Sequence, residues 1–346
     1  NNTAVGYLSL SANTTGASNT ASGRSALQIN TTGAYNSAFG QYALLNNSTA
    51  SYNTAVGYAA LQENTTGVDN VAMGYNSLDA NTTGANNTAI GIQALTNNTT
   101  ADNNTAVGKN ALKANTTGTA NTFVGALAGD GVTTGTTNAG LGYASLGGMT
   151  GAASSNTGLG YAAGVSITSG SNNIAIGANA LNTGRPGGQI TTQSNVIGLG
   201  TADHTSAHIQ IDWTIASDAR DKTDFTPLDL GLDFVKALSP LTYKWDKRAK
   251  YGDNTADDYD LSAQTPDGTH KENWLDIGFK AQEVEALEIA AGYNKNNSTN
   301  LVSSCSDDGK QMGLQYSKFV PILVKAIQEQ NALITSLTDR IAALEA

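Results

Sequence analysis

The sequence predicts a mainly β chain: a trimeric parallel β-roll or β-solenoid of 17-residue repeats, followed by a small α+β domain that ends in a long coiled-coil helix. Three observations predict this fold. A short motif recurs at a fixed period over the first two-thirds of the 346 residues, the charge density rises near residue 217, and the chain follows heptad spacing from Tyr316 onward.

The repeat begins with Asn-Thr-Ala-Val-Gly or a close variant. Nine copies are evenly spaced and start at Asn2, Asn19, Asn36, Asn53, Asn70, Asn87, Asn104, Asn121 and Asn138, and looser copies start at Asn156, Asn173 and Asn195. In the nine copies the fifth residue is glycine, the fourth is mostly apolar, and most carry leucine at the ninth. We expect two strand-like segments per copy, with the fourth-position residue and the leucine forming an inner ladder flanked by Ala and Asn.

Composition supports a solenoid for residues 1–200. Gly, Asn and Thr recur in every copy, which opposes helix, and the Asn-Thr-Thr-Gly segments are typical of turns. Each rung is thin and buries little apolar surface, so we expect three chains to associate side by side. The repeats resemble the heads of trimeric bacterial adhesins, which are left-handed β-rolls, although the period of this chain is longer than is typical of that family.

The overall composition disfavours several classes of function. A net charge of −10 argues against nucleic acid or anionic membrane as a partner, and no apolar run is long enough for a transmembrane helix. Residues 1–216 hold only seven acidic and four basic residues, without clustered carboxylates, so we expect no turnover of an external substrate. His204 and His208, four residues apart, could share a helix face and hold a metal, and on a trimer axis either could meet two copies of itself. We expect instead a connector over 201–216, and no metal or cofactor.

Residues 217–346 form a second module that contains the other 21 acidic and 14 basic residues. Its predicted elements are a helix over 229–238 with Leu232, Val235 and Leu238 inward, a strand over 241–245, a surface excursion over 246–275, a strand near 276–280 and a helix over 281–287. The single cysteine, Cys305, excludes an internal disulfide.

A long helix is predicted from about 316 to 346. Its two core positions hold Val320, Ile327, Ile334 and Ile341, and Leu323, Gln330, Leu337 and Leu344. Ile at position a and Leu at position d favour a coil of two helices when the coil is isolated. A short coil fused to a trimeric body follows the body, so we expect three helices. Gln330 either sets the register or is a packing defect.

The module resembles the self-cleaving intramolecular chaperone domain found at the C-termini of phage tail fibres and tailspikes, including endosialidases, and in the myelin regulatory factors. The matching pieces are Ser217-Asp218-x-Arg220-x-Lys222, Leu-Thr-Tyr-Lys-Trp at 241–245, Gly278-Phe-Lys-Ala-Gln-Glu-Val284, Tyr316 and the closing helix. The chain departs from the pattern at Asp221, where the family usually has an apolar residue.

The resemblance implies a single self-cleavage. Ser217 would attack the carbonyl of Ala216, and Lys222 would act as the general base. A lysine base must be neutral, which burial on trimer assembly favours, whereas the carboxylate of Asp221 favours the charged amine. Cleavage would then wait for correct folding.

The function that this organisation predicts is the distal part of a phage tail fibre with its own chaperone. We expect a homotrimer in the virion, assembled in the host cytoplasm, which joins upstream fibre proteins and attaches to a host receptor, in particular a glycan. The chain begins within a repeat, so we expect further sequence before Asn1. The alternative is the head of a bacterial trimeric surface adhesin, a class that normally ends in a membrane β-barrel.

Overall fold

The computed structural model describes residues 1–182, 189–201, 204, 215, 217–252, 259–294, 301–306 and 309–346. The chain divides into two compact units, and we describe each by itself. The first contains Asn1–Asn182 and Gln189–Asp203, and the second contains His204–Ala346.

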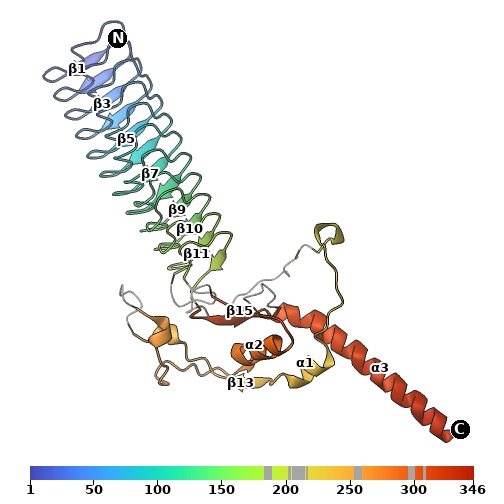
Figure 1. Ribbon diagram of the computed structural model, residues 1–346. Helices are drawn as coiled ribbons and strands as arrows, with labels where there is room; N and C mark the ends of the chain where they lie inside the picture. Colours follow the sequence, from blue (N-terminus) through green and yellow to red (C-terminus); the bar gives the residue numbers. More distant parts are fainter. Residues whose placement is uncertain are drawn as a thin grey trace. The chain divides into compact units, whose positions relative to one another are not determined.

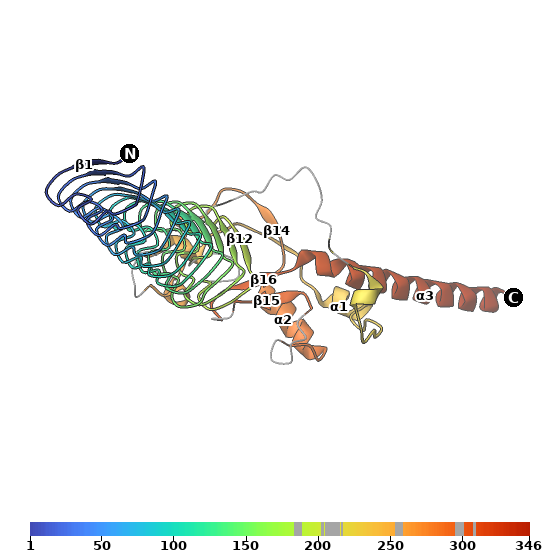
Figure 2. The same ribbon diagram turned by 90° about the horizontal axis from the view of Figure 1, so that it is seen from above.

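The first unit is a β-solenoid (Figures 1 and 2). Each rung contributes one three-residue strand to a 12-stranded sheet in which every neighbouring pair is parallel and sequential. The strands are β1 (Thr3–Val5), β2 (Thr20–Ser22), β3 (Ser37–Phe39), β4 (Thr54–Val56), β5 (Val71–Met73), β6 (Thr88–Ile90), β7 (Thr105–Val107), β8 (Thr122–Val124), β9 (Ala139–Leu141), β10 (Thr157–Leu159), β11 (Ile174–Ile176) and β12 (Ile197–Leu199). The predicted solenoid is therefore confirmed.

The rung length changes only near the C-terminal end of the solenoid. Thr3 pairs with Thr20, one regular period further on, whereas Ala139 pairs with Thr157 and Ile174 pairs with Ile197. The loops of these later rungs therefore hold one and six extra residues. In the last rung the strand begins at Ile197, so this copy starts at Val196 and not at the predicted Asn195.

The second predicted segment of each copy is not a strand. It is a series of turns in which residues such as Leu27 have positive φ, here 50°. The turns still bond to the next rung, for example through Leu27 N–H and the carbonyl of Ala43 at 3.0 Å. Glycine is required at the fifth position, because a Cβ on Gly23 (φ +139°) would lie 2.4 Å from the carbonyl oxygen of Gly40.

The inner face differs from the prediction in one respect. The leucines are buried as expected, but the residue that joins them is the third-position alanine, such as Ala55 or Ala72, and not the fourth-position residue. Side chains alternate across a strand, so burying the third residue turns the fourth outward. We call these outward apolar residues the outer stripe; it comprises Val5, Phe39, Val56, Met73, Ile90, Val107, Val124, Leu141, Leu159, Ile176 and Leu199.

Two columns of asparagines, buried from Asn19 onward, run along the solenoid. In the first, which opens each copy, Asn53 Oδ1 accepts from the backbone N–H of Asn70 at 3.0 Å, and Asn53 Nδ2 donates to the carbonyl of Gly67 at 2.9 Å. The second column comes from the turns and comprises Asn13, Asn30, Asn47, Asn64, Asn81, Asn98 and Asn115, each bonded to the next by its side chain. These bonds satisfy buried amides only when successive rungs are in register.

One rung has a different core. Phe123 is fully buried at the place of the alanine in its neighbour Ala106. Its ring fills the space left by two glycines: Gly140, the paired residue on the next strand, and Gly129, which stands one period after Leu112. A Cβ on Gly140 or Gly129 would lie 2.4 or 2.6 Å from a carbon of that ring. The larger side chain and the two missing ones compensate for each other in volume.

The second unit is a small α+β module. Its helices are α1 (Leu232–Ala237), α2 (Ala281–Ala290) and α3 (Phe319–Glu345), and its strands form two antiparallel pairs, β13 (Leu241–Tyr243) with β14 (Asp276–Gly278) and β15 (Ser303–Cys305) with β16 (Met312–Leu314). Short 3₁₀ turns are η1 (Ala219–Asp221), η2 (Arg248–Lys250), η3 (Leu261–Ala263) and η5 (Tyr316–Lys318). The core comprises Leu230, Phe234, Val284, Val302, Phe319 and Ile322.

The first predicted helix is shorter than expected and is turned differently. Of the three residues predicted to face inward, Val235 and Leu238 pack partly on the core, whereas Leu232 is only half-buried and Phe234 is the buried residue of α1. The helix ends at Ala237, since Leu238 is already extended two residues before Pro240, and Phe234 is the side chain that α1 buries.

The long helix α3 carries both buried and exposed apolar residues. Phe319, Ile322 and Ala326, in its N-terminal part, are buried in the module. The apolar residues at the predicted heptad core positions are exposed; we call this set the seam, and it comprises Val320, Leu323, Ile327, Ile334, Leu337, Ile341 and Leu344. Pro321 is tolerated because it lies in the first turn, where backbone N–H groups have no helical partner.

Candidate self-cleavage site

The structure brings the two predicted site residues together. The Nζ group of Lys222 donates a hydrogen bond of 2.6 Å to the Oγ atom of Ser217. The turn η1 makes this contact possible, since its three residues fold the chain back between Ser217 and Lys222, and the N–H of Lys222 closes the turn on the carbonyl of Ala219 at 3.3 Å. A nucleophile within hydrogen-bond reach of a base is the arrangement that acyl transfer requires.

Asp218 caps this turn. Its Oδ1 atom accepts from the backbone N–H of Arg220 at 2.9 Å, and its carboxylate also forms an ion pair with the Arg220 guanidinium at 2.5 Å. These hydrogen bonds stabilise the charged carboxylate and lower the pKa of Asp218 below its ordinary value, and the same pair raises the pKa of Arg220. Both residues belong to the motif, but the sequence alone does not show what they do.

Asp221 does not pair with Lys222. Within the described part of the chain, no ion pair or side-chain hydrogen bond joins Asp221 to Lys222. The departure from the family pattern at this position therefore leaves the contact between Ser217 and Lys222 intact.

Ser217, Lys222 and the whole of η1 are exposed in a single chain. A lysine acts as a base only in its neutral form, which burial favours and water does not. One chain thus supplies the geometry of the site but not the dry environment.

Two residues singled out in the sequence lie outside the described residues. They are Ala216, whose carbonyl is the predicted point of attack, and His208. His204 is described, and among the described residues no group of three or more His, Cys, Asp or Glu side chains is placed to hold a metal ion. Nor does any helix of the described chain combine the length and apolarity that crossing a membrane demands.

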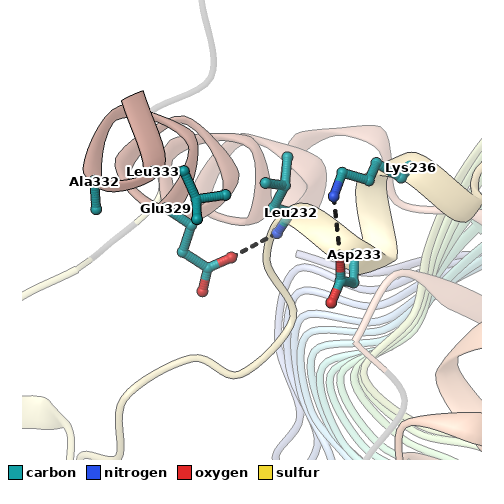
Figure 3. A pocket seen from close by; sticks show the side chains of 6 residues that line it. All are labelled: Leu232, Asp233, Lys236, Glu329, Ala332 and Leu333. Carbon is teal, nitrogen blue, oxygen red and sulfur yellow. Dashed lines mark hydrogen bonds and ion pairs between the residues drawn. The ribbon is translucent and has the colours of Figure 1, made fainter. Parts of the chain in front are cut away.

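A carboxylate from α3 holds α1 in place (Figure 3). Glu329 Oε2 accepts from the N–H of Leu232 at 2.7 Å, at the first residue of α1, where no side chain of the helix itself provides a cap. This bond is the main cause of the lowered pKa of Glu329. A groove of about 380 Å³ lies beside the contact, lined by Leu232, Asp233, Lys236, Glu329, Ala332 and Leu333. The two partners are 97 residues apart, so no local pattern predicts the bond.

A second carboxylate anchors the strand pair β15–β16. Glu288 is 1% exposed, and it accepts from the N–H groups of Leu301, Val302 and Ser303 at 3.0, 2.6 and 3.0 Å, and from the Ser303 hydroxyl. Nothing in the sequence distinguishes Glu288 from Glu283 and Glu285 of the same helix. It fixes α2 to the chain that leads into α3.

The other motif pieces meet around Tyr316. Its hydroxyl accepts from the N–H of Phe279 at 3.3 Å, and its ring stacks on Phe279 with centroids 6.3 Å apart. A Cβ on Gly278 would lie 2.4 Å from that hydroxyl oxygen, so the glycine of the motif permits the approach. Gly278 in turn pairs with Leu241 of the Leu-Thr-Tyr-Lys-Trp segment.

Comparison with known families gives one match. Residues 217–293 match the family described as chaperone of endosialidase, and this match begins at Ser217 and includes the turn η1, β13, β14 and α2. No curated protein and no solved structure matched the chain. Its C-terminal region is a chaperone-of-endosialidase domain, an intramolecular chaperone of the kind carried by phage tail fibres and tailspikes, preceded by β-solenoid repeats.

Proposed function

We propose that the chain is the distal part of a phage tail fibre, whose C-terminal module drives trimerisation and folding and is then released by self-cleavage before Ser217. The observation that carries the proposal is the hydrogen bond between Ser217 and Lys222, because it lies at the first residues of the chaperone domain, which follows the solenoid in sequence. A cut there separates the solenoid from the domain.

The chemistry requires only groups of the chain and one water. Ser217 Oγ attacks the carbonyl carbon of Ala216 while its proton passes to the neutral amine of Lys222. The proton is then delivered to the Ser217 nitrogen as the peptide bond breaks, which leaves an ester on Oγ and a free α-amine. Water hydrolyses the ester to the carboxylate of Ala216 and restores the Ser217 hydroxyl. Each chain performs this reaction once on itself.

Trimerisation is supported by two separate apolar surfaces. The solenoid exposes the outer stripe, and α3 exposes the seam, where Ile327 is 63% exposed. Exposed apolar runs of this length are unusual on a monomer. A coil formed along the seam would fix the register of three chains, and pairing along the outer stripe would then bury the apolar surface that each thin rung leaves uncovered.

Release of the module after folding has a physical advantage. A parallel solenoid depends on contacts between distant rungs and exposes strand edges, so it nucleates slowly and tends to aggregate. A trimeric clamp at the C-terminal end starts the stack in register. Once the clamp is removed, an unfolded solenoid can no longer refold rapidly. The folded fibre that remains is then kinetically trapped.

Attachment to a host receptor belongs to the same proposal. A tail fibre positions its distal part at the cell surface, and a glycan is the class of receptor that we infer for it. Location in the virion and assembly in the host cytoplasm follow from this function. So does a connection to other fibre proteins upstream of Asn1.

The test is expression of the full chain beside three variants, Ser217→Ala, Lys222→Ala and Ser239→Ala, with denaturing gels and intact mass. We expect the wild type and Ser239→Ala, the control at an exposed serine of the same module, to yield fragments 1–216 and 217–346. The first two variants should stay whole. A wild-type chain that trimerises and stays whole would refute the self-cleavage.

A further inference from the structure

Two residues of the Ser-Asp-x-Arg-x-Lys motif take no part in the proposed cleavage chemistry. Asp218 and Arg220 nevertheless make the densest set of polar contacts at the site. The carboxylate of Asp218 accepts from the backbone N–H of Arg220 at 2.9 Å, from Nε at 3.1 Å to each oxygen, and from Nη2 at 2.5 Å. The planar guanidinium of Arg220 therefore donates to both carboxylate oxygens of Asp218. Bidentate pairs of this kind are among the strong hydrogen bonds of proteins.

The position of Asp218 makes its charge important. It follows Ser217 directly, and Lys222 Nζ lies 2.6 Å from the Ser217 hydroxyl. A free carboxylate so close to the amine would favour the charged ammonium, which cannot accept the proton of the serine. The other charged groups of this exposed segment are Asp221 and Asp224, so Arg220 is the only cation that offsets them apart from Lys222 itself.

We propose that Arg220 is a positioning residue for self-cleavage: it withholds the carboxylate of Asp218 from Lys222. Asp218 has the complementary task of capping η1 and thereby holding Ser217 and Lys222 together. The inference rests on the proposed self-cleavage. It assigns a separate role to each of the two remaining charged residues of the motif.

These roles can be separated by substitution. Asn caps a helical turn about as well as Asp, so Asp218→Asn keeps the hydrogen bond from the Arg220 N–H but removes the charge. Arg220→Ala keeps the cap but leaves the carboxylate of Asp218 without the guanidinium that pairs with it. The double variant Asp218→Asn/Arg220→Ala keeps the cap and has neither charge, so the net charge around Lys222 returns to that of the wild type.

The experiment follows cleavage of the full chain made by cell-free synthesis and shifted to buffers between pH 6 and 10. The fraction cut is read on denaturing gels over time, and trimer content is measured in parallel by native mass spectrometry. We expect Arg220→Ala to cut about tenfold more slowly than the wild type near pH 7 and to recover at higher pH, a displacement of the profile by about one pH unit. The double variant should return to the wild-type profile.

Three outcomes would overturn the inference. The first is an Arg220→Ala profile that coincides with the wild type. The second is a loss of rate that is equal at every pH and is not rescued by Asp218→Asn, because such a loss indicates a purely structural role. The third is a wild-type chain that never cuts, which refutes the proposed self-cleavage as well. Only the first two leave that proposal standing.

Discussion

The Nδ2 group of Asn64 donates a hydrogen bond of 2.9 Å to the Oδ1 atom of Asn47, one rung earlier, and Asn64 Oδ1 accepts the equivalent bond from Asn81. Asn64 is therefore bonded to the rungs on both sides. The column ends at Asn115, since the next copy has Val132 there, and the Oδ1 atom of Asn115 is accordingly a buried acceptor without a partner. An inner member and the last member of the column thus differ by one inter-rung bond.

This difference predicts unequal effects of the same substitution. Asn64→Val breaks two inter-rung side-chain bonds, whereas Asn115→Val breaks one and moves the unpaired acceptor to Asn98. We expect Asn64→Val to destabilise the solenoid by about 1–2 kcal/mol more. Native-state hydrogen exchange of the neighbouring rungs measures this difference in stability. Equal loss of protection in the two variants would show that the column contributes no register energy.

Phe123 predicts a compensated substitution. Phe123→Ala should cost about 3–5 kcal/mol, because the two neighbouring glycines cannot fill the space left by the ring. Adding Gly129→Leu and Gly140→Ala rebuilds the core of the other rungs, and we expect it to recover most of that loss. Urea unfolding followed by circular dichroism compares the variants. A triple variant less stable than Phe123→Ala would contradict the account of this rung.

Glu288 predicts a large effect of a small change. Glu288→Gln places an amide NH₂ group against N–H donors and removes the charge they stabilise, so we expect the module to lose about 2–4 kcal/mol. Glu285→Gln on the same helix is the control, with less than about 0.5 kcal/mol expected. Denaturant unfolding followed by tryptophan fluorescence reports on the module, because all three tryptophans lie at or after Trp213. Similar midpoints for the two variants would count against the anchoring role.

The seam on α3 predicts the oligomeric state. In a Ser217→Ala chain, which keeps the module attached, light scattering should give three times 35.4 kDa. Ile334→Asp places a carboxylate at a core position of the coil and should reduce the mass toward that of one chain. Gln328→Asp, on an exposed position outside the seam, should leave the trimer intact. A trimer that survives Ile334→Asp would show that α3 is not its clamp.

The sequence predicted most of the fold because the repeat is strict. A constant period, glycine at a fixed place and recurring leucines were enough to predict the rungs and their order. The outward turn of the fourth residue differs from the prediction, because an apolar residue in a repeat indicates an inner position. In the structure alanine is the inner residue, and the apolar fourth residue forms the outer stripe.

The site was predicted in part. Ser217 and Lys222 were recognised from the motif, and their contact depends on a turn whose cap, Asp218, is also in the motif. Glu329 and Glu288 could not be predicted, because each bonds to backbone groups far away in sequence or hidden by the fold. Local patterns show which residues are apolar or charged, but the partner of a buried carboxylate is set by tertiary packing.

The dependence of the solenoid on the module is measured most directly by making residues 1–216 with and without 217–346. Analytical ultracentrifugation and hydrogen exchange are then applied to the released and the separately made fragment. We predict that the fragment released from the full chain is trimeric and protected along the rungs, whereas the fragment made alone is aggregated or unprotected. Identical mass and protection for the two preparations would contradict the account.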